Sequence, residues 1–277
     1  MKNLIEPHGS STLNPLFIED IQKRERILQD ADNMKKVLIN SAAAANVVML
    51  GAGYFNPLEG FMGKNDAFSV AENLVTENGL FWPIPILNLT KIDDNFAVGE
   101  KIALLDPNID GNPIIAIQEI SEITILNDDE LQLLTHKIFG TTDTEHPGVA
   151  NFLSLGNVML AGNIQVLNYS YFPEDFPGTF YTAPEIRDML VKANWGTTVA
   201  FQTRNPMHRA HKEISYRAAI ENGANLLIHP VVGETKPGDV DHFTRVRCYQ
   251  KILNYFPEGT TALSLLPLAM RMAGPRE

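Results

Sequence analysis

Cysteine is almost absent from this sequence of 277 residues, in which Cys248 is the only one. A single cysteine excludes a disulfide within the chain and a zinc site built from several cysteines. The first residues lack the apolar core of a signal peptide, and no stretch approaches the ~18 apolar residues that a membrane-spanning helix needs. These absences predict a cytoplasmic protein without a membrane partner.

Basic residues are also in short supply, since 22 Lys and Arg face 33 Asp and Glu and the net charge is -11. A general nucleic-acid-binding protein needs a broad basic surface that releases counterions from phosphates. The composition therefore argues against a nucleic-acid partner, but it leaves room for a local basic pocket that binds a small anion. A length of 277 residues suggests one large domain or two smaller ones, and a hydrophobic share of 44% can supply a sizeable core.

Residues 1–170 are typical of a mostly β domain with added helices. Strands are expected over four apolar, β-rich stretches: 81–90, 100–106, 113–126 and 157–167. Residues 106–113 have the composition of a hairpin loop. Helices are expected at 18–40, where one break is allowed, and at 64–75. "GAGYFN" (51–56) lacks the third glycine of a dinucleotide-binding motif and is interpreted as a turn.

Residues 171–277 have a different pattern, in which strands and helices alternate. Thr182 and Glu185 have the spacing of a capping box, so a helix is expected to begin there. Apolar strands are expected at 197–202, 225–232 and 261–268. Near-continuous apolar strands that alternate with helices predict an α/β domain with a parallel sheet and right-handed crossovers.

Two further helices are expected between these strands. Asn205 suits an N-cap, Pro206 suits the first helical position, and Gly223 suits the end of that helix. Asp241 is expected to cap the next one. Ligands of such sheets bind beyond the carboxyl ends of the strands, so the polar loops that follow the strands are candidate site segments.

The stretch "AFQTRNPMHRAH" (200–211) stands at one of these strand ends. A helix start offers free N–H groups and partial positive charge to a phosphate, and Arg204 adds a forked donor suited to phosphate or sulfate. His208 and His211 are three residues apart and can share one face of the first helical turn. Together with Gln202 and Asn205, these residues predict a polyanion site.

Other interpretations remain open for single residues. A pair of histidines at this spacing often consists of exposed surface residues without a binding role, or caps a helix. Zinc binding is disfavoured, because neither an HExxH arrangement nor a nearby cysteine is present. Lys236 belongs to a turn-like loop, "GETKPGD", and could be a mobile cation or simply solvated. Arg245 and Arg247 are expected on a solvated helix face, and capping or structural roles are expected for His136 and His146.

Six stretches taken together resemble the ATP sulfurylase (sulfate adenylyltransferase) family. They occur in the family's order over nearly the whole chain: "NPLEGFMGKNDAFSVAENL", "FWPIPI", "FGTTDTEHPGV", "QTRNPMHRAH", "GETKPGDVDHFTRVRCYQ" and "PLAMRMAGPRE". The resemblance implies a PUA-like domain over 1–170 and a Rossmann-like nucleotidyltransferase domain over 171–277. It also implies that sulfate attacks the α-phosphate of ATP, which arrives with Mg²⁺, to give adenosine 5'-phosphosulfate and pyrophosphate.

Carried over position by position, the resemblance assigns roles to named residues. Gln202 and Arg204 are expected to contact sulfate, and they line the nucleotide and α-phosphate together with Thr203 and Asn205. His208 and His211 are expected to steady the charge on phosphorus and pyrophosphate. Thr203, Arg204, Asn205, His208 and His211 thus form the expected catalytic set, and Lys236, Met270 and Arg271 join the expected ATP-binding set.

The family pattern continues past Glu277 with a further active-site loop of the type G-R-D-H-A-G. The resemblance therefore predicts an incomplete catalytic domain here and a homo-oligomer when the chain is full length. Two alternatives follow: an inactive fragment that binds only a nucleotide or a partner, and an RNA-binding role for the PUA-like part, against which the acidic composition counts.

Overall fold

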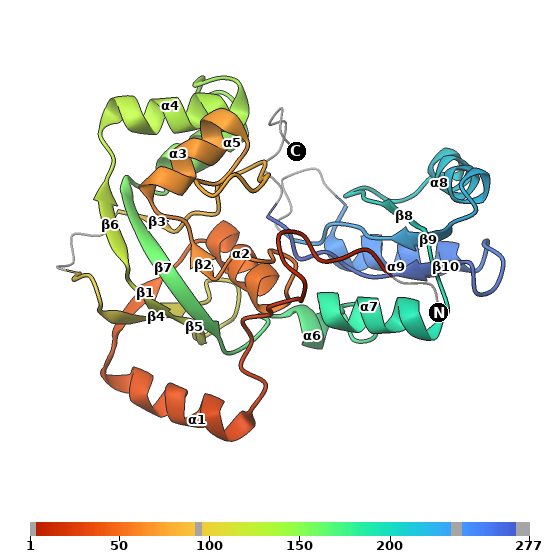
Figure 1. Cartoon of the computed structure of the whole chain (residues 1–277), viewed down its shortest axis with the longest axis horizontal. Coiled ribbons are helices and arrows are strands. Elements are labelled where there is room, and N and C mark those ends of the chain that lie inside the picture. The colour runs from red at the N-terminus through yellow and green to blue at the C-terminus, as the bar shows by residue number, and fades with distance from the viewer. Residues whose placement is uncertain (1–3, 92–95, 234–239, 270–277) are drawn as a thin grey trace.

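The computed structural model describes residues 4–91, 96–233 and 240–269, which form two domains side by side (Figure 1). The helices of the first domain are α1 (Ile21–Asp30), the 3-10 helix η1 (Ala31–Asn33), α2 (Ser41–Gly51), α3 (Lys64–Asn73), α4 (Asp128–Phe139) and α5 (Pro147–Ser154). Its strands are β1 (Lys35–Leu38), β2 (Gly60–Phe61), β3 (Leu89–Thr90), β4 (Lys101–Leu105), β5 (Ile114–Glu119), β6 (Glu122–Ile125) and β7 (Val158–Val166).

The second domain follows the short helix α6 (Phe172–Asp175). It consists of α7 (Ala183–Lys192), β8 (Thr198–Phe201), α8 (Arg209–Glu221), β9 (Asn225–Ile228), α9 (His242–Leu253) and β10 (Thr261–Leu263). The expected fold class, a β-rich domain followed by an α/β domain with a parallel sheet, is confirmed.

Strand β7 organises the sheet of the first domain because four strands pair with it, all antiparallel. Along β7, β5 pairs with residues 164–166 and β6 with residues 158–161. Strand β2 pairs with residues 162–163 and β3 with residues 158–159. Strand β4 lies antiparallel to β5, and β1 lies parallel to β4. Side chains such as Ile102, Leu104, Ile115 and Leu160 are fully buried in the core that this sheet forms with the helices.

Between β5 and β6 the pairing with β7 shifts by one residue, because Gln118 pairs with Ile164 and Glu122 pairs with Ala161. Gly162 lies opposite this bulge with φ of 140°, a value that favours glycine. A Cβ atom at Gly162 would lie 2.0 Å from the Glu119 carbonyl oxygen. The close approach of two backbones therefore requires glycine at this position.

Several expectations for the first domain are confirmed: the strands at 100–106 and 157–167, the helix at 64–75 and the turn at 51–56. The expected strand 113–126 corresponds to β5 and β6, which the bulge separates. The helix expected at 18–40 is wrong in its second half, because it ends at Asp30 and β1 follows. Residues 81–90 form a strand only at β3, since Pro83 and Pro85 have no N–H to donate to a ladder.

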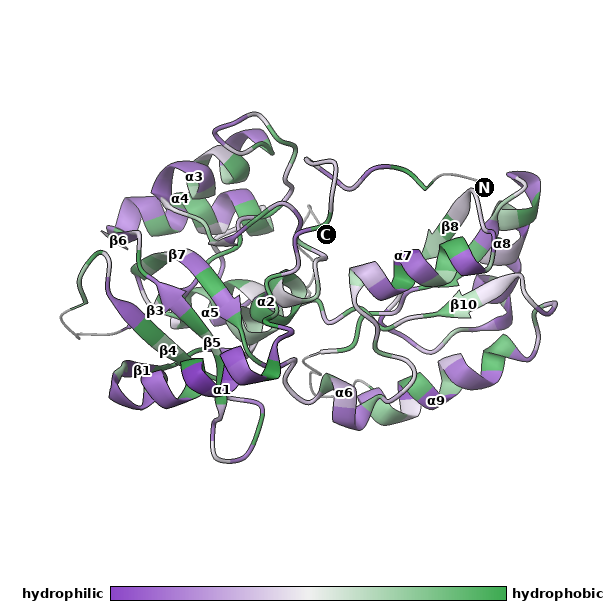
Figure 2. Cartoon of the chain, turned by 60° about the horizontal axis from the view of Figure 1, so that its bottom comes forward, coloured by the Kyte–Doolittle hydropathy of each residue, from purple (hydrophilic) through white to green (hydrophobic). Residues whose placement is uncertain are grey.

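Helices α2, α4 and α5 are absent from the expectations. Most of α2 is buried, so its sequence lacks the polar face that marks an amphipathic helix. Helix α1 is the opposite case: none of its residues is buried, and Figure 2 shows it largely hydrophilic. The two capping roles expected in this domain differ in outcome, because His146 does cap α5 whereas His136 lies in the last turn of α4.

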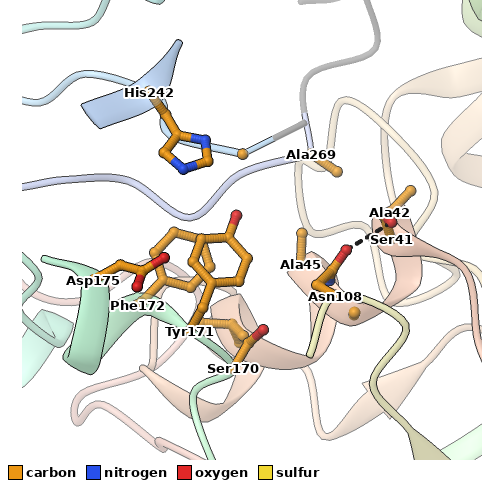
Figure 3. Close-up of a pocket in the computed structure, with 13 residues that line it drawn as sticks. Ser41, Ala42, Ala45, Asn108, Ser170, Tyr171, Phe172, Asp175, His242 and Ala269 are labelled. Carbon is orange, nitrogen blue, oxygen red and sulfur yellow. Dashed lines mark hydrogen bonds between the residues drawn. The ribbon is translucent and has the colours of Figure 1, made fainter. Parts of the chain in front are cut away.

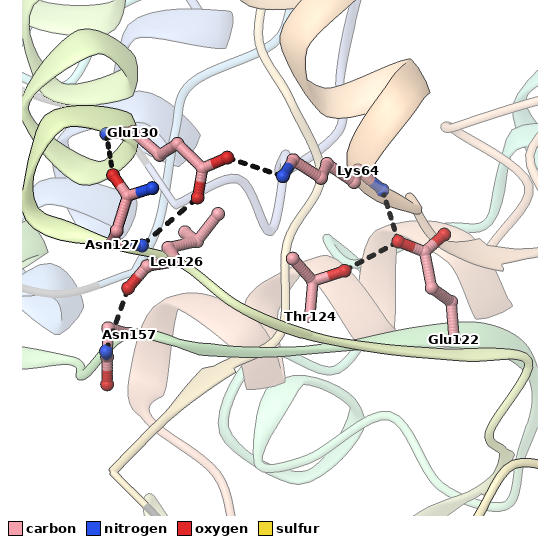
Figure 4. A network of polar contacts seen from close by, with 7 residues as sticks. All are labelled: Lys64, Glu122, Thr124, Leu126, Asn127, Glu130 and Asn157. Atoms are coloured by element: carbon pink, nitrogen blue, oxygen red, sulfur yellow. Dashed lines mark hydrogen bonds and ion pairs between the residues drawn. The ribbon is translucent and has the colours of Figure 1, made fainter.

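A polar network joins α3, α4 and β6 at the surface of the first domain (Figure 4). The Lys64 ammonium group pairs with Glu130, and the Lys64 backbone N–H donates to Glu122 at 3.2 Å. Asn127 and Glu130 form a capping box at the start of α4. The bonds from Lys64 and from the Asn127 backbone N–H lower the pKa of the Glu130 carboxyl. Lys64, Glu122 and Glu130 therefore have a structural role, because their contacts link α3, α4 and β6 at the surface.

In the second domain the strands run in the order β10-β9-β8 and are parallel. Leu226 and Ile228 of β9 belong to the main hydrophobic core, which includes residues of α8 and α9. Leu227 points to the other face, where it packs with Ile186 and Leu190 of α7. This alternation gives the central strand helices on both faces. The expected capping box of Thr182 and the expected cap of Asp241 are confirmed.

The start of the chain lies against the second domain, beside α7 (Figure 1). Leu4 packs on the apolar cluster of α7, and the Arg187 guanidinium donates to the Ile5 carbonyl at 2.6 Å. The Tyr54 hydroxyl donates to the Tyr181 carbonyl, also at 2.6 Å. The two domains are therefore held together at more than the connecting segment. In the ranges described, no helix combines the length and apolar character that a bilayer crossing requires.

Replacing Gly162 by Ala tests the close backbone approach. We expect Gly162→Ala to lower the free energy of unfolding by about 3 kcal/mol or more, because both strands must move apart. Gly79→Ala is the matched control: Gly79 has φ of 78° but no atom near its would-be Cβ. It should cost about 1 kcal/mol for the left-handed backbone alone. Denaturant unfolding measures both, and equal losses would contradict the assignment.

Candidate anion site at the end of β8

The candidate site begins where β8 ends, at the carboxyl edge of the parallel sheet. The His229 N–H donates to the Phe201 carbonyl at 2.9 Å, and the Val231 N–H donates to the Thr203 carbonyl at 2.8 Å. Pairing between the two segments therefore continues beyond the last residue of β8. It fixes the start of the 202–208 loop at the edge where ligands of such sheets bind.

A tight turn follows at Thr203. Its Oγ1 accepts from the Asn205 N–H at 3.2 Å, and its hydroxyl lies 3.3 Å from the Asn205 carbonyl. The expected N-cap at Asn205 is wrong: α8 begins at Arg209 and His208 is its N-cap. The carbonyls of Arg204 and Asn205 accept hydrogen bonds from side chains of α9. They therefore do not accept the first hydrogen bonds of a helix, and α8 begins three residues later than expected. Gly223 follows the helix with φ of 58°, as expected for a stop.

Two buried side chains of α9 hold this turn. The Arg245 Nη1 donates to the Arg204 carbonyl at 2.7 Å, and the Tyr249 hydroxyl donates to the Asn205 carbonyl at 2.9 Å. The expectation that Arg245 lies on a solvated face is wrong, since it is 2% exposed. Arg247 is exposed as expected. Residue spacing alone does not predict that Arg245 is buried. It lies next to the apolar Val246 in the sequence, and nothing in the sequence indicates which face of α9 contacts the loop.

The two histidines meet at the first turn of α8, with ring centroids 5.0 Å apart. The His211 Nδ1 accepts from the His208 backbone N–H at 3.3 Å, so this ring caps the helix start. Its Nε2 then carries the proton and can donate to an oxyanion. The cap and the anion-binding interpretations of this pair are therefore compatible. The His211 ring also lies near Phe201, at 5.8 Å between centroids.

The loop presents polar side chains at different depths. Gln202, Asn205 and His208 are exposed, whereas Thr203, Arg204 and His211 are partly buried. The structure thus brings the expected residues of 202–211 into one short turn and the helix start that follows it. Lys236, Met270 and Arg271 lie outside the described residues.

His229 is a polar residue at this edge that the sequence reasoning misses. It follows β9 directly, and its ring lies 5.7 Å from that of Tyr54 in the first domain. Its Nε2 is buried and has no hydrogen-bond partner in the described part of the chain. Burial lowers the pKa of His229 to about 4, so the ring is neutral near pH 7. The available signal was its position, immediately after an apolar strand and before Pro230.

A cavity of about 290 Å³ lies between the domains, beside the ends of β9 and β10 (Figure 3). Its wall includes the stacked rings of Tyr171 and Phe172, with the ring of His242 nearby. Burial, followed by the charge of Arg245, lowers the pKa of His242. Because its described lining has aromatic rings, Asp175 and a largely neutral histidine, this cavity suits an uncharged flat group better than a polyanion. The 202–211 segment remains the candidate anion site.

Family models match both domains of the chain. A PUA-like domain model matches residues 5–169, and an ATP-sulfurylase model matches residues 178–277. The fold and the site thus define a two-domain protein that joins a PUA-like domain to an ATP-sulfurylase domain.

Curated relatives make the assignment specific. The sulfate adenylyltransferase of Alcanivorax borkumensis is 48% identical over all of this chain and 70% of its own length. That of Allochromatium vinosum is 43% identical over 99% of this chain and 70% of its own length, and that of Schizosaccharomyces pombe is 44% identical over 96% and 54%. The chain belongs to the sulfate adenylyltransferase family.

A solved structure supports the same fold. A chain of the hexameric APS kinase from Thiobacillus denitrificans superposes with a TM-score of 0.78 at 31% sequence identity. The match covers 99% of this chain and 49% of that one.

Stability should depend on pH through His229. Its folded pKa of about 4 lies below the usual 6.5, so the unfolded state binds more protons in between. We expect the free energy of unfolding to be highest above pH 6.5 and to fall by up to about 3 kcal/mol toward pH 4. His229→Leu should lose this part of the pH dependence, whereas His136→Gln, at an exposed position, should keep it. Denaturant unfolding across this pH range gives the result, and equal slopes in wild type and His229→Leu would contradict it.

Proposed function

We propose that this chain carries the sulfate adenylyltransferase reaction of sulfur assimilation or dissimilation. A sulfate oxygen attacks the α-phosphorus of ATP, the bond to the bridging oxygen of the β-phosphate breaks, and pyrophosphate leaves with that electron pair. The products are adenosine 5'-phosphosulfate and pyrophosphate. The main support is the convergence of anion-binding side chains on the loop after β8 in a chain of this family.

The proposed roles follow from the chemistry of each group. Gln202 and Arg204 bind sulfate, because a guanidinium offers a fork of donors that matches tetrahedral oxyanions. Thr203 and Asn205 line the nucleotide and its α-phosphate in the tight turn. The reaction needs no nucleophile from the protein, so these residues act by positioning the substrates and stabilising charge.

His208 and His211 stabilise the negative charge that develops on the pentacoordinate phosphorus and the pyrophosphate. Their place at the N-terminus of α8 supports this role, because free N–H groups and the helix dipole favour anions there. The bond from the His208 N–H to the His211 Nδ1 orients the second ring.

Further participants are proposed from the family resemblance. Lys236, Met270 and Arg271 join the ATP-binding set. Mg²⁺ enters as part of the ATP substrate; among the described residues, no three His, Cys, Asp or Glu side chains cluster in a way that could hold a metal ion. We further propose a cytoplasmic location and, for the full-length chain, a homo-oligomer, the latter supported by the superposed APS kinase, which is hexameric.

A second candidate is a nucleotide- or partner-binding module without turnover. The chain spans 70% of the length of two of the relatives and 54% of the length of a third. Binding and turnover therefore need to be measured separately.

Substitution of the loop residues tests the proposal. We expect the chain to form ATP from adenosine 5'-phosphosulfate and pyrophosphate. Arg204→Ala and His208→Ala should each lower the rate by roughly 100- to 1000-fold, because each removes a charge-stabilising donor. Arg217→Ala, at an exposed residue of α8 that pairs with Glu213, is the control and should retain full activity.

The possible outcomes separate the two candidates. An ATP analogue that binds in titration calorimetry, without any ATP formation, would favour the binding module. Wild-type activity in both loop variants would overturn the site assignment. A chain with neither binding nor turnover would overturn the proposed function.

A further inference from the structure

Helix α9 reaches the candidate loop with two side chains that the family resemblance does not assign to the site. Arg245 and Tyr249 are four residues apart, so they share one face of the helix. Both are buried, at 2% and 0% exposure. Their donors end on the carbonyls of two successive loop residues, Arg204 and Asn205.

These bonds hold the backbone of Arg204 and Asn205, and the direction of that backbone determines where the side chains proposed to bind the anion lie. The Thr203 carbonyl is already held by the Val231 N–H, so three consecutive carbonyls of the loop have defined partners. The Arg245 Nη1 also lies 3.4 Å from the Val231 carbonyl, so one guanidinium bridges the loop and the segment after β9. Hydrogen bonds from α9 therefore fix the backbone that carries the Arg204 side chain.

Arg245 also brings a charge that is not neutralised within the described part of the chain. Its Nε and Nη2 atoms are buried without hydrogen-bond partners, and none of the ion pairs found there includes it. A buried cation without a partner is unfavourable, and a nearby anion offsets that cost. A polyanion bound on the loop would thus be stabilised by Arg245 without touching it.

We propose that Arg245 and Tyr249 are positioning residues of the candidate site, which hold the Thr203–Asn205 turn by its carbonyls and place a buried cation beneath it. The inference rests on the proposed function, because it takes the loop to bind the anionic groups of substrate and product. Tyr249 acts through geometry alone, whereas Arg245 acts through both geometry and charge.

Three substitutions separate these contributions. Tyr249→Phe removes one hydroxyl and keeps the ring, Arg245→Lys keeps the charge but loses the forked geometry, and Arg245→Met removes the charge at similar length. Arg247→Met and Tyr255→Phe are matched controls, since both residues are exposed, one on α9 and one just after it.

The measurement is the affinity of the folded protein for inorganic pyrophosphate in titration calorimetry, with thermal unfolding of the ligand-free protein in parallel. Tyr249→Phe should weaken binding by about tenfold, as expected for one lost hydrogen bond. Arg245→Met should weaken it by about 100-fold, and Arg245→Lys should recover part of that loss. Hydrogen exchange at the Asn205 amide should accelerate in Tyr249→Phe, and both controls should match wild type.

A role confined to folding gives a different pattern. In that case Arg245→Met and Tyr249→Phe would unfold at lower temperature, while the folded protein bound pyrophosphate as tightly as wild type. That result, with binding still lost in Arg204→Ala, would overturn this inference and leave the proposed function standing. A wild-type chain that binds neither pyrophosphate nor ATP would overturn both.

Discussion

The parallel pairing of β8 with β9 is the constraint on which the candidate site depends. Because the ladder continues past Phe201 to Thr203, the chain enters the polar loop with a fixed direction and depth. The loop then has little freedom of its own, since its next two carbonyls are taken by α9. A short sheet register thereby determines where an arginine, an asparagine and a pair of histidines lie.

Polar side chains near this edge are buried with incomplete hydrogen bonding. Arg245 and His229 each have a buried side-chain nitrogen without a hydrogen-bond partner in the described residues. Buried polar groups without hydrogen-bond partners lower the free energy of unfolding, so these residues reduce the stability of the protein near this edge. Apolar clusters lie on both faces of β9 beside these groups, and the first domain contributes Tyr54 to the same region.

Sequence reasoning recovered the features that rest on local chemistry. The capping residues Thr182 and Asp241, the stop at Gly223 and the alternation of β8, β9 and β10 with helices follow from spacing and residue type. It failed where tertiary contacts decide. Asn205 has good N-cap chemistry, but side chains of α9 bind the carbonyls of that turn, and α8 starts at Arg209 with His208 as its N-cap instead.

The same distinction applies to buried elements and buried charges. Helix α2 has no polar face to reveal its period, because the fold covers it on nearly all sides. Arg245 has the sequence context of a surface residue, and only the packing of α9 against the loop buries it and brings it to the Arg204 carbonyl. The candidate anion-binding stretch could be proposed from the sequence, whereas the buried residues of α9 that contact it could be identified only from the structure.

The first residues of the chain show that the domains are not interchangeable pieces. Leu4 and Ile5 belong to the first domain by sequence, yet they cover α7 and accept a bond from Arg187 in the second. A chimera that exchanges one domain between relatives at the connecting segment would pair this terminus with a foreign helix. The natural unit for exchange is therefore the second domain together with the first few residues of the chain, although the two are separated by the whole of the first domain.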